Sequence, residues 1–186
     1  MLRGRTRPRS GYTLIEVLVT VALLTVIAVV VVPILARQGA ADRVARADTE
    51  LKGITDALDV FAEDVGEWPP SLTQLVTPLV SGDQDICGTA YNGGERDRWT
   101  GPYLSRPVAG GGLPVGIGMV ATSFTLSPGA DIDFLHLTVT GVEEGDALEL
   151  DARVDGDGDA SAGTVRWTAA GNGQVTVTWR IPIHPC

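Results

Sequence analysis

The chain has 186 residues, of which 44% are hydrophobic, and a formal net charge of −9. Four arginines precede Gly11: Arg3, Arg5, Arg7 and Arg9. The rest of the chain therefore has a net charge of about −13, four units more negative than the net charge of the full chain. An acidic body repels nucleic acid phosphates, and a nucleic acid partner is therefore not expected. This length accommodates one modest domain and an appended segment.

The basic start is followed by an almost entirely aliphatic run from Leu14 to Ala36. As a helix this run is about 34 Å long, enough to cross a bilayer core of roughly 30 Å. It is also longer than the apolar region of a secretory signal, which has about 7–15 residues. The run therefore predicts a membrane helix, although weak small-residue cleavage sites near 39–41 leave a conventional signal as an alternative.

One carboxylate, Glu16, stands near the start of this run. An acid in an apolar membrane segment is unfavourable without a partner, and snorkelling to the interface is the simpler explanation for it. The surrounding sequence, Gly11-Tyr12-Thr13-Leu14-Ile15-Glu16 after a short basic leader, resembles the class III signal of type IV prepilins and type II secretion pseudopilins.

That resemblance implies cleavage between Gly11 and Tyr12 by a membrane prepilin peptidase, with methylation of the new N-terminus at Tyr12, where the family more often has Phe. It also implies that Glu16 attracts the N-terminal amine of a neighbouring subunit during polymerisation. Because any other axial register would leave Glu16 unpaired in lipid, this charge pair would select one register. Members of the family polymerise with themselves and with other pilin-like subunits on an inner-membrane assembly platform.

Pro33 interrupts the aliphatic run and predicts a kink or a locally melted turn, as a tolerated membrane proline or as a feature of assembly. Beyond it the pattern becomes amphipathic and predicts a helix that ends near Val65-Gly66, before Trp68-Pro69-Pro70. The apolar stripe of this helix comprises Val44, Ala47, Leu51, Ile54, Leu58 and Phe61.

Two further passages make the resemblance more specific, because they point to one kind of subunit within this family. Asp64-Val65-Gly66-Glu67-Trp68-Pro69 and Trp99-Thr100-Gly101-Pro102-Tyr103-Leu104 are similar to passages of the major pseudopilin of type II secretion. The resemblance covers roughly residues 1–107. After Pro107 the sequence departs from the family, because a Gly-rich stretch replaces the expected passage and predicts a flexible surface loop.

The C-terminal part predicts strands, because short β-branched runs alternate with Gly, Asp and Asn turns. The expected strands are Thr122 to Leu126, Phe134 to Thr140, Ala147 to Val154, Thr164 to Thr168 and Gln174 to Ile183. The predicted fold is α+β, with the N-terminal helix packed on an antiparallel sheet as in pilins. The expected organisation is a leader (1–11), a membrane and assembly half-helix (12–36), an amphipathic half-helix (37–66), a variable loop region (67–121) and a β region (122–186).

Cys87 and Cys186 are the two cysteines, and an even count in an exported chain favours a disulfide. A metal site that also uses His136 and His184 is the alternative, although no Cys-x-x-Cys pair is present. Pilins of the resembled family often close the C-terminal region with such a bond.

Asp155, Asp157 and Asp159 alternate as in the first half of a calcium loop, and Asp151 is a further possible ligand. Ala160 replaces the usual glycine, and Arg166 stands where a bidentate carboxylate is needed. An acidic turn between strands is therefore preferred to a calcium site. No other cofactor is expected.

No catalytic motif is present, so the chain is not expected to be an enzyme. The resemblance implies a structural subunit of a type II secretion pseudopilus that helps to export proteins. A major or minor pilin of a surface fibre for adhesion, motility or DNA uptake is one alternative, and a signal-anchored periplasmic binding or enzymatic domain is another. The expected location is the inner membrane, crossed once, with the C-terminal domain in the periplasm and the fibre in the periplasm or at the cell surface.

Overall fold

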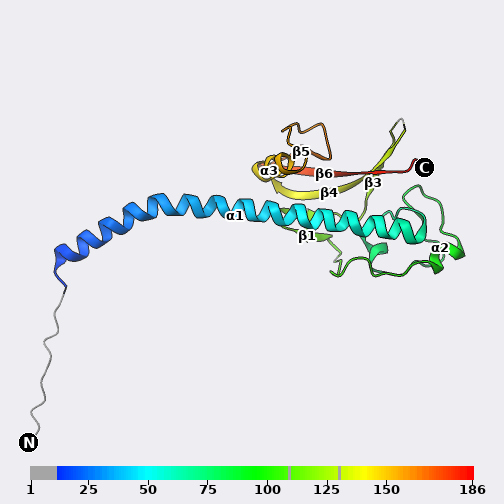
Figure 1. Cartoon of the computed structure of the whole chain (residues 1–186), viewed down its shortest axis with the longest axis horizontal. Coiled ribbons are helices and arrows are strands. Elements are labelled where there is room, and N and C mark those ends of the chain that lie inside the picture. The colour runs from blue at the N-terminus through cyan, green and yellow to red at the C-terminus, as the bar shows by residue number, and fades with distance from the viewer. Residues whose placement is uncertain (1–11, 109, 130) are drawn as a thin grey trace, which may run out of the picture. The chain divides into compact units, whose positions relative to one another are not determined.

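The structure is a computed structural model that describes residues 12–108, 110–129 and 131–186; the side chains of residues 30 and 32–37 are not described. It divides into two compact units, Met1–Gly39 and Ala40–Cys186. One helix, α1 (Leu14–Val65), belongs to both (Figure 1). The remaining elements are η1 (Leu72–Leu75), α2 (Gly93–Asp97), β1 (Leu113–Val115), β2 (Gly118–Val120), β3 (Thr125–Ser127), β4 (Asp133–Glu143), α3 (Glu144–Val154), β5 (Val165–Gly171) and β6 (Gln174–Ile183).

The strands form one antiparallel sheet with the order β1-β2-β4-β6-β5, and β3 pairs with β4 outside this path. The central pair joins β4 to β6 from Asp133 opposite Ile183 to Glu143 opposite Gln174, with an irregularity between Val139 and Val142. Gly141 lies in that irregularity with a φ of 74°, which glycine adopts without strain. The predicted α+β fold, a long helix on an antiparallel sheet, is confirmed.

The C-terminal part of α1 lies along the sheet and supplies the centre of the core (Figure 1). The predicted apolar stripe is correct, because each of its members is at most 1% exposed: Val44, Ala47, Leu51, Ile54, Leu58 and Phe61. The inner sheet residues Leu135, Leu137 and Val177 are fully buried in the same cluster. Burial of a large aliphatic side chain contributes about 1.5–3 kcal/mol, so the packing of this stripe on the sheet stabilises the domain.

The predicted strand at Ala147 to Val154 is wrong, because this segment belongs to α3. Leu148 and Leu150 alternate with polar residues and suggest a strand, but Ala147 and Leu150 lie three residues apart and are both fully buried on one helix face. The abundance of Glu, Ala and Leu also favours a helix.

The flexible loop predicted after Pro107 is also wrong, because this stretch contains the hairpin β1–β2. Its glycines permit close approach to neighbouring backbone. A Cβ atom on Gly116 would lie 2.2 Å from the carbonyl oxygen of Arg43, and one on Gly118 would lie 2.4 Å from that of Thr140. The sheet therefore begins at Leu113, before the predicted boundary at residue 122, and the predicted strand at 122–126 is displaced to Thr125–Ser127.

Candidate functional site

The first turn of α1 is organised by Thr13 and Glu16. The backbone N–H of Glu16 donates to the carbonyl oxygen of Thr13 at 3.1 Å and to its hydroxyl at 3.3 Å. The spacing Thr13-x-x-Glu16 is that of a capping box, although only the threonine half of the box is formed. This geometry begins the helix two residues after the predicted cleavage point and places Glu16 in its first turn.

The N-terminal part of α1 exposes apolar side chains around its circumference in the part of the chain that the structure describes. Among its described side chains, large aliphatic residues are 42% to 82% exposed, whereas α1 residues in the second unit bury one stripe. Thr20 and Thr25 donate their hydroxyls to the carbonyl oxygens of Val17 and Ala22, so their polarity is satisfied within the helix. In the described part of the chain the Glu16 carboxylate has no hydrogen-bond or ion-pair partner. Exposed apolar surfaces of this size are typical of sites that contact a membrane or another protein.

Within the residues described, no helix combines the length and hydropathy needed to cross a membrane. Gly11 and the rest of the predicted leader lie outside the described residues. The helix α1 continues through Pro33, where the sequence predicts a kink or a melted turn, and the side chain of Pro33 also lies outside the described residues.

The two passages that narrowed the resemblance contact each other at the end of α1. The Asp64 carboxylate accepts hydrogen bonds from the hydroxyls of Thr100 at 2.6 Å and Tyr103 at 3.0 Å. Arg98 donates to the terminal carbonyl oxygens of α1 at Asp64 and Val65. Because the last carbonyls of a helix lack internal partners, Arg98 closes this end and fixes the following loop to it.

The C-terminus is held by one covalent bond and one carboxylate. Cys87 and Cys186 form a disulfide with a Cα–Cα distance of 5.6 Å. Both thiolates are therefore unavailable to the alternative metal site with His136 and His184. The buried Asp133 carboxylate accepts from the N–H of Cys186 at 3.1 Å and from that of Gly129 at 3.1 Å. The segment after β6 is thereby fixed to the loop that contains Cys87 and to the start of β4.

The aspartates of the candidate calcium loop connect α3 to β5. Asp151 accepts from the N–H of Gly158 at 2.7 Å, and Asp155 from that of Val165 at 2.7 Å. Asp157 and Asp159 accept from the backbone N–H groups two residues ahead, those of Asp159 and Ser161. The loop therefore follows a helix, whereas the sequence predicted a turn between two strands. Among the residues described, no group of three His, Cys, Asp or Glu side chains could hold a metal ion.

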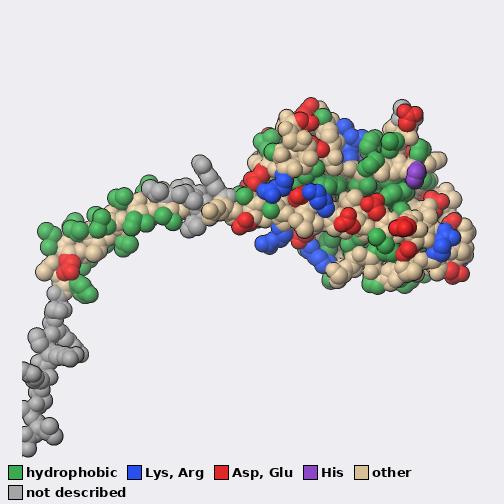
Figure 2. Space-filling model, viewed as in Figure 1, with side chains coloured by type: hydrophobic (Ala, Val, Ile, Leu, Met, Phe, Trp, Pro, Cys, Tyr) green, Lys and Arg blue, Asp and Glu red, His purple; other side chains and the backbone are tan. Residues whose placement is uncertain are grey.

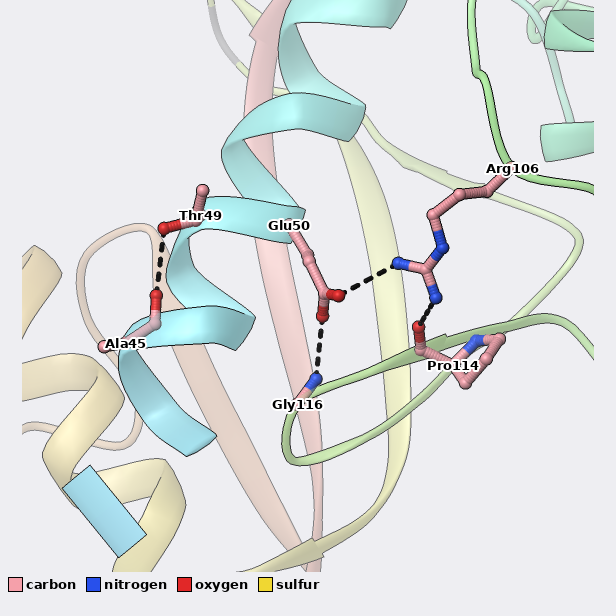
Figure 3. Close-up of polar contacts among 6 residues, drawn as sticks. All are labelled: Ala45, Thr49, Glu50, Arg106, Pro114 and Gly116. Atoms are coloured by element: carbon pink, nitrogen blue, oxygen red, sulfur yellow. Dashed lines mark hydrogen bonds and ion pairs between the residues drawn. The ribbon is translucent and has the colours of Figure 1, made fainter. Parts of the chain in front are cut away.

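Sequence reasoning did not predict a polar contact between α1 and the β1–β2 hairpin. Glu50 accepts from Arg106 at 3.0 Å and from the N–H of Gly116 at 2.8 Å, and Arg106 also donates to the carbonyl oxygen of Pro114 at 2.6 Å (Figure 3). These residues are far apart in the sequence, and no local pattern marks them as partners.

The family described as "Prokaryotic N-terminal methylation motif" matches residues 6–32. The chain carries the class III prepilin signal of type IV pilin-like proteins. No curated protein matches the chain, and no solved structure does. The predicted motif at Gly11 to Glu16 is thus confirmed at the level of this broad family.

The motif supports a type IV pilin-like protein and is found in membrane-anchored, prepilin-type proteins. Proteins of this pilin-like family are structural and are not enzymes. The motif also implies processing by a prepilin peptidase and polymerisation with pilin subunits. The exposed apolar part of α1 and Glu16 both lie largely within the matched segment and form the candidate functional site.

Proposed function

We propose that the chain is a structural subunit of a type II secretion pseudopilus. In this proposal a peptidase cuts between Gly11 and Tyr12, Tyr12 is methylated, and the N-terminal part of α1 crosses the inner membrane once before polymerisation. The observation that carries the proposal is the exposed apolar surface of α1, at whose start the Glu16 carboxylate has no hydrogen-bond or ion-pair partner among the described residues. The contact of Asp64 with Thr100 and Tyr103 supports the pseudopilus, because it joins the two passages shared with that family.

A pilin of a surface fibre is the second candidate. The C-terminal disulfide between Cys87 and Cys186 and the long sheet beyond residue 107 favour it, because the resemblance to pseudopilins ends there.

A proteomic comparison of wild-type and deletion cells distinguishes the two. Loss of secreted proteins with surface fibres intact supports a pseudopilus subunit. Missing fibres with an unchanged set of secreted proteins support a surface pilin. A mature mass that begins at methylated Tyr12 is expected in both cases, whereas a retained leader or a cut near Ala41 would contradict assembly of either kind.

Glu16→Ala and Glu16→Gln test the role of the carboxylate. Both variants should be processed normally and yet be depleted from the fibre, because an uncharged side chain cannot pair with the amine of Tyr12 in a neighbouring subunit. Asp42→Ala is the control, since Asp42 is an exposed acid of the same helix outside the apolar part. Equal incorporation of all three variants would refute the charge pair.

A further inference from the structure

The outer face of the sheet carries a cluster of basic and aromatic side chains, which we call the basic face: Phe134, His136, Arg166 and Arg180. His136 of β4 lies opposite Arg180 of β6, and Arg166 of β5 lies opposite Thr178, two residues before Arg180. Because side chains alternate between the two faces of a sheet, these residues share the face that points away from the core. All four are half-buried.

The cations of the basic face lack acidic partners in the part of the chain that the structure describes. Arg166 and Arg180 form no ion pair there and converge on one carbonyl oxygen, that of Gly163, at 3.4 and 3.3 Å. Arg180 also lies 3.8 Å from the centre of the Phe134 ring. The Nε atom of Arg180 and the Nε2 atom of His136 are buried and find no hydrogen-bond partner among the described residues.

The electrostatics of the basic face show uncompensated positive charge. Burial, and then Arg166, lowers the pKa of Arg180; burial, then Arg180 and Arg166, lowers the pKa of His136. Asp159 is the nearby acid, and hydrogen bonds from Ser161 lower its pKa, with a smaller contribution from Arg166. Asp159 is fully exposed, is engaged by Ser161 and makes no ion pair with Arg166. A carboxylate from another molecule would therefore stabilise the two guanidinium groups.

The same chain presents a matching surface on α1. Asp56, Asp59 and Glu63 are exposed and lie three and four residues apart, so they share one side of the helix, which we call the acidic stripe. Val60, 48% exposed, lies among them. In the described residues none of the three acids forms an ion pair, and burial followed by repulsion from Asp56 raises the pKa of Asp59. Acidic side chains gather along this part of α1 in Figure 2.

A fibre built from copies of one chain needs contacts between two different patches, since a self-matching patch would close into a dimer. The remainder of the chain after Gly11 is strongly acidic, so most surfaces of two copies repel each other. We propose that the basic face of one subunit binds the acidic stripe on α1 of a second copy. This inference rests on the proposed function, since it concerns the polymer that the subunits form. Phe134 and Val60 would add an apolar contact beside the ion pairs.

The test uses the full chain in its native host and measures fibre yield in the presence of normal processing. Arg166→Glu with Arg180→Glu should reduce fibre yield by about tenfold or more, because like charges then face each other. Asp59→Arg with Glu63→Arg should have a similar effect, and all four changes together should restore most of the yield. The control is Arg153→Glu, which reverses an exposed charge that is already paired with Glu149 outside both patches.

A photo-crosslinking residue at Val60 provides a second measurement that does not alter charge or the sheet. The expected adduct joins two subunits and maps to β4 or β6, near Phe134 or Arg180. The inference would be overturned by full fibre yield from the variant with Arg166→Glu and Arg180→Glu. It would also be overturned if the variant with all four substitutions had as low a yield as the two double variants, or if the adduct mapped elsewhere. If the wild-type chain forms no fibre at all, the proposed function fails instead.

Discussion

Removal of the Glu50 carboxylate should loosen the β1–β2 hairpin from α1. Glu50→Ala leaves the part-buried N–H of Gly116 without its acceptor, which costs about 1–3 kcal/mol. Loss of the ion pair adds only about 0–1 kcal/mol, since the Arg106 side chain is 43% exposed. The free energy of unfolding should therefore fall by about 2 kcal/mol, which lowers the melting temperature by roughly 4–8 °C for a domain of this size.

The assay is urea denaturation of the full chain in detergent, with tryptophan fluorescence as the signal of unfolding. All four tryptophans lie in the unit Ala40–Cys186, so the signal reports that unit. Glu50→Gln retains an oxygen for Gly116 and should lose about 1 kcal/mol or less, as should Arg106→Ala. A Glu50→Ala variant as stable as wild type, or a Glu50→Gln variant as unstable as Glu50→Ala, would refute the assigned role of the Gly116 contact.

Four further predictions concern the same unit. Replacement of Cys87 and Cys186 by Ser should lower the free energy of unfolding by about 4–5 kcal/mol in the chain-entropy treatment, because 99 residues separate them; an unchanged urea midpoint would contradict this. Burial lowers the pKa of His136 below 6.5, so its contribution to stability is complete above that pH and is lost as the pH falls. The urea midpoint should therefore depend less on pH in His136→Asn than in the wild type. Gly53→Ala should raise the melting temperature through about 0.5–1 kcal/mol of helix stabilisation, whereas Gly116→Ala should lower it, because its Cβ would collide with Arg43; equal shifts would refute the difference. Millimolar calcium should leave the melting temperature unchanged, since Asp151 and Asp155 already accept backbone hydrogen bonds; a rise that EDTA reverses would show a calcium site in this loop.

Local periodicity was sufficient to predict the parts of the fold that have one dominant pattern. The α1 stripe repeats over five turns, and β6 alternates along its whole length, so each has one plausible structure. Residues 147–154 fit the periodicity of a strand and that of a helix. They form a helix, which buries Ala147 and Leu150 on one face. In the sequence Gly116 and Gly118 resemble glycines of a flexible loop. In the structure each lies so close to a neighbouring backbone that a Cβ atom would not fit.

Contacts between distant residues could not be predicted in this way. The Glu50–Arg106 pair and the convergence of Arg166 with Arg180 depend on sheet register and on the packing of α1, which no local pattern specifies. The N-terminal motif is different, because it is defined by short-range spacing: a glycine, a carboxylate five residues later and an apolar run. This motif was therefore predictable from the sequence, whereas the basic face became evident only in the fold.

The hydrophobic pattern changes along α1, so the two parts of this helix expose different surfaces. Between Leu14 and Val29 the exposed apolar residues surround the helix, whereas from Val44 to Phe61 they form one buried stripe. The domain obtains its core from the second pattern alone, so substitutions in the first part should leave domain stability unchanged. In the proposed function this apolar surface, which no described residue covers, is stabilised by lipid or by other subunits. In the same proposal Glu16, which has no ion-pair partner among the described residues, favours a partner that supplies a compensating charge, and the N-terminal amine of Tyr12 in a neighbouring subunit would meet that requirement.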